Sequence, residues 1–201
     1  MAYKINNKRI KGQCNDSMNF AARFFGHLHT INKHRRKVIA NCFRAGIPWR
    51  GLMHDLSKYS PTEFWNGVKY FQGMRSPNEA EREDIGYSRA WMHHKGRNRH
   101  HFEFWTDYDP VTRLCSPVKM PVVFVAEMFC DRMAASKTYM KKNYTDAAPL
   151  QYFLKGKHRR IIHPETSDLL EGWLTLLSEQ GEEAVFAEIR RELREARRKK
   201  S

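Results

Sequence analysis

The sequence has no long apolar run, and this absence excludes a membrane-spanning protein. None of its apolar stretches approaches the ~20 residues that a transmembrane helix needs. The mean hydropathy of the 201-residue chain is −0.74. The residues from Met1 to Arg9 also lack the apolar core of a signal peptide. We therefore expect a cytoplasmic protein with no membrane partner.

The four cysteines show neither a metal-binding nor a disulfide pattern. Cys14, Cys42, Cys115 and Cys130 are far apart, and none of them forms a Cys-x-x-Cys pair. This spacing argues against a zinc ribbon and against a disulfide framework. We expect reduced thiols, most of which are buried.

Acidic residues are few in comparison with basic ones. The chain has 22 Asp and Glu residues against 36 Lys and Arg residues, which gives a formal net charge of +14. Such an excess favours polyanionic ligands such as nucleotides, phosphoesters or nucleic acid. The basic residues concentrate in segments 33–37, 95–101, 155–160 and 197–200. We expect the first and last of these segments to be solvated helix surface and a basic tail.

No segment has a convincing strand pattern, whereas apolar residues recur at helical spacing along most of the chain. Possible N-cap residues at 15–17 precede the first helical pattern, and Pro or Ser-Pro steps precede several later ones. Residues 95–120 lack a sustained period, so we expect mostly loop there, with a short helix at 99–105. The fold class is therefore all-α, with about six to eight helices in a single domain over residues 1–201. The expected helices cover residues 17–42, 48–59, 61–73, 77–94, 121–135, 169–177 and 185–193.

The segment from Gly51 to Lys58 contains adjacent metal-binding side chains. His54 offers an imidazole nitrogen and Asp55 a carboxylate oxygen, and both suit divalent first-row metals. His34 and Asp131 fall on the apolar faces of two other expected helices, whereas residues 35–37 can point outward. A buried, isolated carboxylate is costly, so Asp131 must be paired, coordinated or protonated. Two imidazoles and two carboxylates from three helices predict a site for Mn, Fe, Co, Ni or Mg.

The order His, His-Asp, Asp resembles the HD superfamily of metal-dependent phosphohydrolases. Segments 34–38, 52–58 and 130–133 look like the family's first His helix, its His-Asp-x-x-Lys segment and its closing Asp-Arg helix. The resemblance implies an HD-like helical core at about 17–142 and a helical extension at about 165–198. It also implies that His34, His54, Asp55 and Asp131 hold a divalent metal ion, with Asp55 and Lys58 as catalytic residues.

Residues 91–105 resemble an uncharacterised bacterial and phage family known only as a domain of unknown function. This segment lies where HD proteins with two metals place further His ligands. His94, then His93, is the preferred ligand of a second metal, and His100 and His101 are alternatives. The two His pairs are closer together than is usual in binuclear members, which leaves the second metal open. The other interpretation is that this loop only contacts phosphate or packs at the surface.

Basic side chains near the His-Asp pair are candidates for binding the phosphate of a substrate, because guanidinium and ammonium groups neutralise phosphate charge. Glu63 is interpreted as the third residue of a capping box that starts at Ser60. His158 and His163 are interpreted as structural or surface residues. The candidate phosphate-binding residues are Lys58, Lys95, Arg97, Arg99 and His101.

We therefore expect a metal-dependent phosphohydrolase that acts on a nucleotide or another phosphorylated small molecule. Two alternatives stay open. One is an HD-type oxygenase with two irons, because some HD proteins with additional His ligands have that activity. The other is a nucleic-acid-binding protein with a structural or vestigial metal site, since aromatic and basic residues alternate at 97–105.

Overall fold

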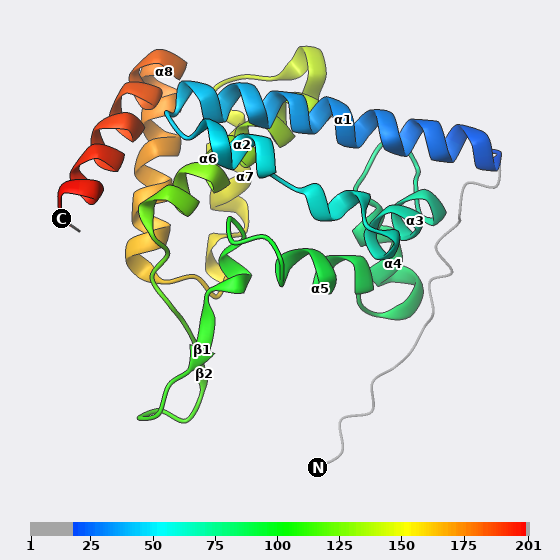
Figure 1. Cartoon of the computed structure of the whole chain (residues 1–201), viewed down its shortest axis with the longest axis horizontal. Coiled ribbons are helices and arrows are strands. Elements are labelled where there is room, and N and C mark those ends of the chain that lie inside the picture. Colours follow the sequence, from blue (N-terminus) through cyan, green and yellow to red (C-terminus); the bar gives the residue numbers. More distant parts are fainter. Residues whose placement is uncertain (1–17, 200–201) are drawn as a thin grey trace.

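The computed structural model describes residues 18–199, which are predominantly helical (Figure 1). This confirms the all-α class. Four short 3-10 helices accompany the main helices, at Leu56–Tyr59, Phe102–Phe104, Lys141–Asn143 and Lys157–Arg159. The main elements are α1 (Phe20–Arg44), α2 (Pro48–Met53), α3 (Pro61–Lys69), α4 (Pro77–Ile85), α5 (Arg89–Lys95), β1 (Thr106–Tyr108), β2 (Cys115–Pro117), α6 (Val122–Met140), α7 (Ala148–Lys155) and α8 (Pro164–Arg198).

Helix α6 lies at the centre of the hydrophobic core. Its Phe129 and Met133 are fully buried, and they belong to one cluster with residues of α1 and α8. Figure 1 shows α1 along one side of the molecule, with α8 crossing near the C-terminal end of α1. Helices α3 and α4 lie towards the N-terminal end of α1, and α5 packs against α3, so the two ends of α1 contact different groups of helices.

The ends of α1 partly match the expectation. The expected capping segment 15–17 lies outside the described residues, and the helix is capped by Asn19, whose Oδ1 accepts the N–H of Ala22 at 2.8 Å. At its other end Gly46 adopts a φ of 77°, a conformation that glycine reaches without strain. This turn brings α2 back against α1, and Gly51 permits the close approach because an added Cβ would lie 2.7 Å from the Cβ of Cys42.

The expected helix at 77–94 is two helices, α4 and α5. Gly86 has a φ of 87° and closes α4 by donating its N–H to the carbonyl of Arg82. Ser88 then caps α5, since its Oγ accepts the N–H of Trp91 at 3.0 Å. Tyr87 consequently lies outside both helices and is 46% exposed, rather than on a buried face. The apolar spacing predicted one continuous helix, but a glycine with positive φ ends the first helix and a new N-cap residue starts the second.

Other boundaries also differ from the expectation. Helix α3 ends at Lys69, before Gly73, and α7 was not predicted. Gly181, with φ 80° and ψ −176°, separates two helical segments within α8, which confirms the break expected there.

A short antiparallel hairpin, β1–β2, corrects the expectation that the chain has no strand. It projects away from the helices (Figure 1), and Thr106 pairs with Pro117. Its loop is closed locally, because Oδ1 of Asp109 accepts the N–H groups of Val111 and Thr112. Strands of three residues are too short to produce a recognisable alternation.

Two of the thiols, Cys42 and Cys130, are buried, whereas Cys115 in the hairpin is exposed. All three are unbridged, and Cys14 lies outside the described residues. None of the helices within residues 18–199 has the length and apolar character required to cross a membrane.

Candidate metal centre

The His-Asp pair occupies a sharp corner between two helices. Helix α2 ends at Met53, His54 has a ψ of 128°, and Asp55 has a φ of 53°. The expected continuous helix from Pro48 to Tyr59 is therefore wrong. Left-handed backbone is costly for most L-residues, but Asp tolerates it better than most. The corner buries both side chains, with 1% of His54 and 2% of Asp55 exposed.

Arg35 on α1 secures this corner rather than pointing into solvent as expected. Its Nε donates to the carbonyl oxygen of His54 at 3.1 Å, and its Nη2 donates to that of Leu52. These carbonyls lie at the broken end of α2, where intrahelical partners are missing. Arg35 thus ties the corner to α1, the helix that carries His34.

The structure brings the four expected ligands of the first metal together. Nε2 of His34 lies 2.9 Å from Oδ1 of Asp131. Nε2 of His54 lies 3.7 Å from the same oxygen and 3.3 Å from Oδ2 of Asp55. The ligand atoms of His34, His54 and Asp55 all lie within 4.8 Å of one another. Residues from α1, the corner and α6 therefore converge on one small volume.

A second set of ligands shares Asp55. Its Oδ1 lies 3.3 Å from Nε2 of His94 and 3.4 Å from Nε2 of His100. Together with His101 these residues present ligand atoms within 4.8 Å of one another. The two oxygens of Asp55 thus face different groups of side chains, an arrangement suited to a carboxylate between two cations. His93 belongs to neither set.

Glu127 on α6 was missed in the sequence. Its Oε1 lies 3.1 Å from Nδ1 of His54 and 3.2 Å from Nδ1 of His100, and its Oε2 accepts from Nε of Arg50 at 2.7 Å. A proton on each Nδ1 leaves the lone pair on Nε2, which points at Asp55. The available signal was its position four residues before Asp131, on the same face of a helix.

Glu63 has a larger role than the capping box expected for it. Its backbone N–H does bind Oγ of Ser60, at 3.5 Å. Its carboxylate, however, lies 2.7 Å from Nδ1 of His93 and 2.7 Å from Nδ1 of His94. Glu63 therefore orients His94 as Glu127 orients His54 and His100.

Burial and neighbouring charges shift the pKa values of the centre in opposite directions. Burial raises the pKa of Asp55, but the positive charges of His54 and Lys58 outweigh it and hold that pKa well below its usual value. Burial lowers the pKa of His54, but Asp55 and Asp131 raise it well above its usual value. The pKa of Asp131 is lowered because His34 and His54 outweigh its burial. The carboxylates are therefore ionised and attract positive charge.

The side-chain atoms of this centre fit a metal ion. Four buried atoms have no hydrogen-bond partner: Nε2 of His54, Oδ1 of Asp55, Nε2 of His100 and Nε2 of His101. Buried polar groups without partners are rare in folded proteins. Imidazole and carboxylate are common ligands of Mn, Fe, Co, Ni and Zn. A third set, formed by His54, His100 and Glu127, is less suitable because Arg50 already neutralises Glu127.

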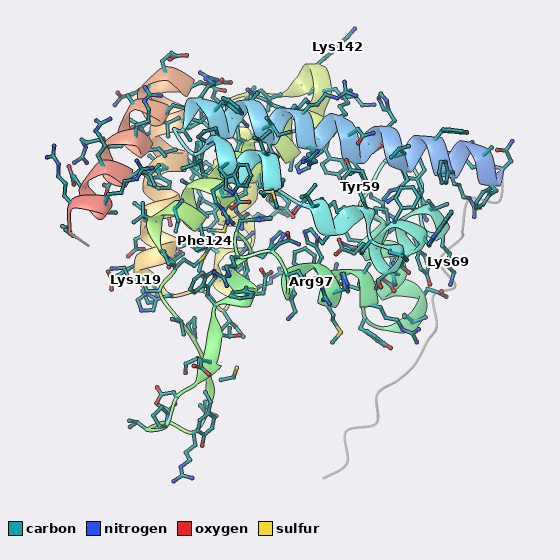
Figure 2. The ribbon with its side chains drawn as sticks, in the orientation of Figure 1. Tyr59, Lys69, Arg97, Lys119, Phe124 and Lys142 are labelled. Atoms are coloured by element: carbon teal, nitrogen blue, oxygen red, sulfur yellow. The ribbon has the colours of Figure 1, made fainter. Side chains whose placement is uncertain are left out.

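The basic residues expected to bind phosphate occupy different environments. Nζ of Lys58 lies 2.7 Å from Oδ2 of Asp55, directly at the centre. Arg97 is exposed beyond the end of α5 (Figure 2), and Arg99 lies over the rings of Phe104 and Phe124. Lys95 is half-buried. His101 belongs to the second ligand set, so its phosphate role and its metal role are alternatives.

His158 is exposed and His163 half-buried, and neither belongs to the candidate ligand sets of residues 18–199.

In the comparison with known proteins, a family model described as "Family of unknown function (DUF5662)" matches residues 23–176. That span includes every residue of both ligand sets, but the description gives no activity. No curated protein and no solved structure matches the chain.

Proposed function

We propose that this chain, which belongs to the family of unknown function DUF5662, is a metal-dependent phosphohydrolase that acts on a nucleotide or another phosphoester. The observation that carries the proposal is the position of Asp55 between two groups of ligand atoms. Its Oδ2 lies 3.3 Å from Nε2 of His54, whereas its Oδ1 lies 3.3 Å from Nε2 of His94 and 3.4 Å from Nε2 of His100. The resemblance to the HD superfamily agrees with this arrangement.

The residues proposed to hold the metal fall into two sets around Asp55. His34, His54 and Asp131 would complete the first set, and His94, His100 and His101 the second. Bound divalent ions would lower the pKa of a coordinated water and polarise a phosphoryl oxygen. Glu63 and Glu127 fix the imidazoles beforehand, so binding requires little rearrangement.

Lys58 is the residue best placed to meet a substrate. It contacts Asp55, and 31% of its side chain remains exposed, so it reaches both the centre and the solvent. Its pKa is raised because Asp55 and Asp131 outweigh the effect of burial, and the ammonium group stays charged. A fixed positive charge beside the reacting phosphate stabilises the negative charge that develops during hydrolysis. The net charge of +14 also favours association with anionic substrates.

The test is a phosphoester panel assayed with Mn, Co and Mg, together with metal analysis of protein purified without added ions. Wild type should hydrolyse at least one class of compound. Asp55→Asn keeps the shape of the side chain, and it should lower kcat/KM by roughly a hundredfold or more. Asp168→Asn, at an exposed position of α8, removes the same charge and should leave the activity unchanged. Equal activity in wild type and Asp55→Asn would refute the proposal.

An HD-type oxygenase with two irons is the second candidate. The observation favouring it is the number of imidazoles, since five His residues surround Asp55 across the two sets. Two irons per chain with oxygen consumption would support this function. A non-iron metal without oxygen consumption would remove it.

A further inference from the structure

Two arginines of the described part of the chain, Arg132 on α6 and Arg160 after α7, carry positive charge without a carboxylate partner. Nε of Arg132 is buried and has no hydrogen-bond partner, and its Nη2 lies 4.0 Å from the sulfur of Met128. Arg160 donates to backbone carbonyls of α7 at Phe153 and Tyr152. Among residues 18–199, neither guanidinium forms an ion pair within 4.0 Å. Unpaired charge in a partly buried position is costly.

Both guanidinium groups lie against the same ring. Cζ of Arg132 is 5.7 Å and Cζ of Arg160 is 5.1 Å from the centroid of Phe153, which is fully buried. Burial and the neighbouring charge of Arg160 lower the pKa of Arg132. Both positive charges thus lie against the same apolar ring and act on each other electrostatically, and a bound anion would offset that repulsion.

Glu103 provides a carboxylate close enough to influence both arginines, but it does not pair with either. Its Oε2 is buried and has no hydrogen-bond partner. Burial raises the pKa of Glu103, although the charges of Arg132 and Arg160 act in the opposite direction. The cluster formed by Arg132, Arg160 and Glu103 therefore keeps an excess of positive charge. It contains two buried atoms without a hydrogen-bond partner, Nε of Arg132 and Oε2 of Glu103.

Two members of this cluster are neighbours of candidate ligands in the chain. Arg132 follows Asp131 in α6, and Glu103 lies two residues after His101. Arg132 and Arg160 are half-buried, so part of each side chain reaches solvent. Although burial lowers the pKa of Arg132, the charge of Asp131 acts to raise it, so the Arg132 guanidinium lies within electrostatic range of the first ligand set.

We propose that Arg132 and Arg160 bind a phosphate group, namely a second phosphate of the substrate adjacent to the one at the metal centre. Guanidinium groups bind phosphate oxygens in pairs, and such charge-assisted bonds strengthen away from water. The assignment to a substrate rests on the proposed function and favours diphosphates, triphosphates or bisphosphates over monophosphates. The anion-binding property itself is independent of the metal.

The experiment is calorimetric titration of the full-length protein with inorganic phosphate after the metal ions have been removed by chelation. Arg132→Gln should weaken phosphate binding about tenfold, as expected for loss of one charge-assisted contact. Glu103→Gln should have the opposite effect and tighten binding several-fold, because a competing negative charge is removed. A purely structural cluster would not give effects of opposite sign. Arg36→Gln, at an exposed position of α1, makes the same change in net charge as Arg132→Gln and should change the affinity less than twofold.

Two results would overturn this inference. One is unchanged phosphate affinity in both Arg132→Gln and Glu103→Gln. The other is an equal loss of affinity in Arg36→Gln and Arg132→Gln, which would indicate only general charge attraction. Thermal melting identifies any variant that fails to fold, and Arg132→Lys, which keeps the charge but loses the paired donors, then replaces Arg132→Gln. Failure of phosphoester hydrolysis alone would refute the proposed function and leave the anion-binding cluster intact.

Discussion

Glu127 joins His54 and His100 through a single oxygen atom. Its Oε1 is 3.1 Å from Nδ1 of His54, a member of the first ligand set, and 3.2 Å from Nδ1 of His100, a member of the second. The hydrogen bonds from these two histidines outweigh burial and lower the pKa of Glu127 to about 2, so it is ionised. One carboxylate on α6 therefore orients imidazoles on both sides of Asp55.

Replacing Glu127 with Gln should weaken metal binding at both ligand sets. The neutral amide no longer enforces a proton on Nδ1 of each imidazole, and loss of such an outer partner typically costs about 10–100-fold in metal affinity. Competition titrations with cobalt and a chelating dye measure both affinities. Glu179→Gln, at an exposed position of α8, is the matched control. Loss of only one affinity would show that Glu127 does not serve both sets.

Metal binding should weaken as the pH falls. Burial lowers the pKa of His54 and of His94, but nearby carboxylates outweigh it, and both pKa values lie above the usual 6.5. A metal ion must displace these protons, so the affinity should drop about tenfold per pH unit for each proton released. Titrations between pH 8 and pH 6 in buffers of different ionisation enthalpy count the protons. An affinity independent of pH would contradict this assignment.

His27 should make the protein less stable in mild acid. Burial, together with the charge of Lys58, lowers its pKa to about 4, so the folded state favours the neutral ring. Above pH 6.5 the ring is neutral in both the folded and the unfolded state. As the pH falls from 6.5 towards 4, the unfolded state binds a proton that the folded state does not, and the free energy of unfolding decreases by on the order of 2–3 kcal/mol. The free energy of unfolding of His27→Gln should therefore depend less on pH over this range than that of wild type. His158→Gln, at an exposed position, should keep the wild-type slope.

Gly51→Ala should destabilise the fold and disturb the His-Asp corner. The new Cβ would lie 2.7 Å from Cβ of Cys42 and 3.2 Å from Cα of Ile39, so α2 must move away from α1. Overpacking of this kind costs about 1–3 kcal/mol, and metal affinity should fall with it. Gly172→Ala on α8 meets no atom within 4 Å and should be neutral or slightly stabilising. Denaturant unfolding of the two variants measures the difference.

Some candidate ligands could be recognised in the sequence because their chemistry conflicts with their position. Asp131 on an apolar helix face needs a partner, and His34 and the His-Asp pair supply suitable groups. Glu63 and Glu127 were harder to recognise. A glutamate is common near helix starts and within helices, so its presence does not indicate a buried role. The contacts of each glutamate in the folded structure indicate that role.

The distribution of the ligands was not predictable from spacing. The close sequence separation of His94 from His100 and His101 left a second ligand set in doubt. The turn that follows α5 at Gly96 explains how residues so close in sequence can reach one carboxylate. It places Nε2 of His100 3.4 Å from Oδ1 of Asp55. The roles of these residues as metal ligands remain a prediction that metal analysis must test.

The sequence by itself determined the helical class, most of the buried faces and the candidates for the first ligand set, because helical periodicity and the cost of buried charge are local properties. Tertiary structure alone decided the left-handed corner at Asp55, the different neighbours of its two carboxylate oxygens, and the positions of Glu63, Glu127 and Arg132. Those features depend on distances between segments remote in the chain. Packing sets such distances, and no local pattern encodes them.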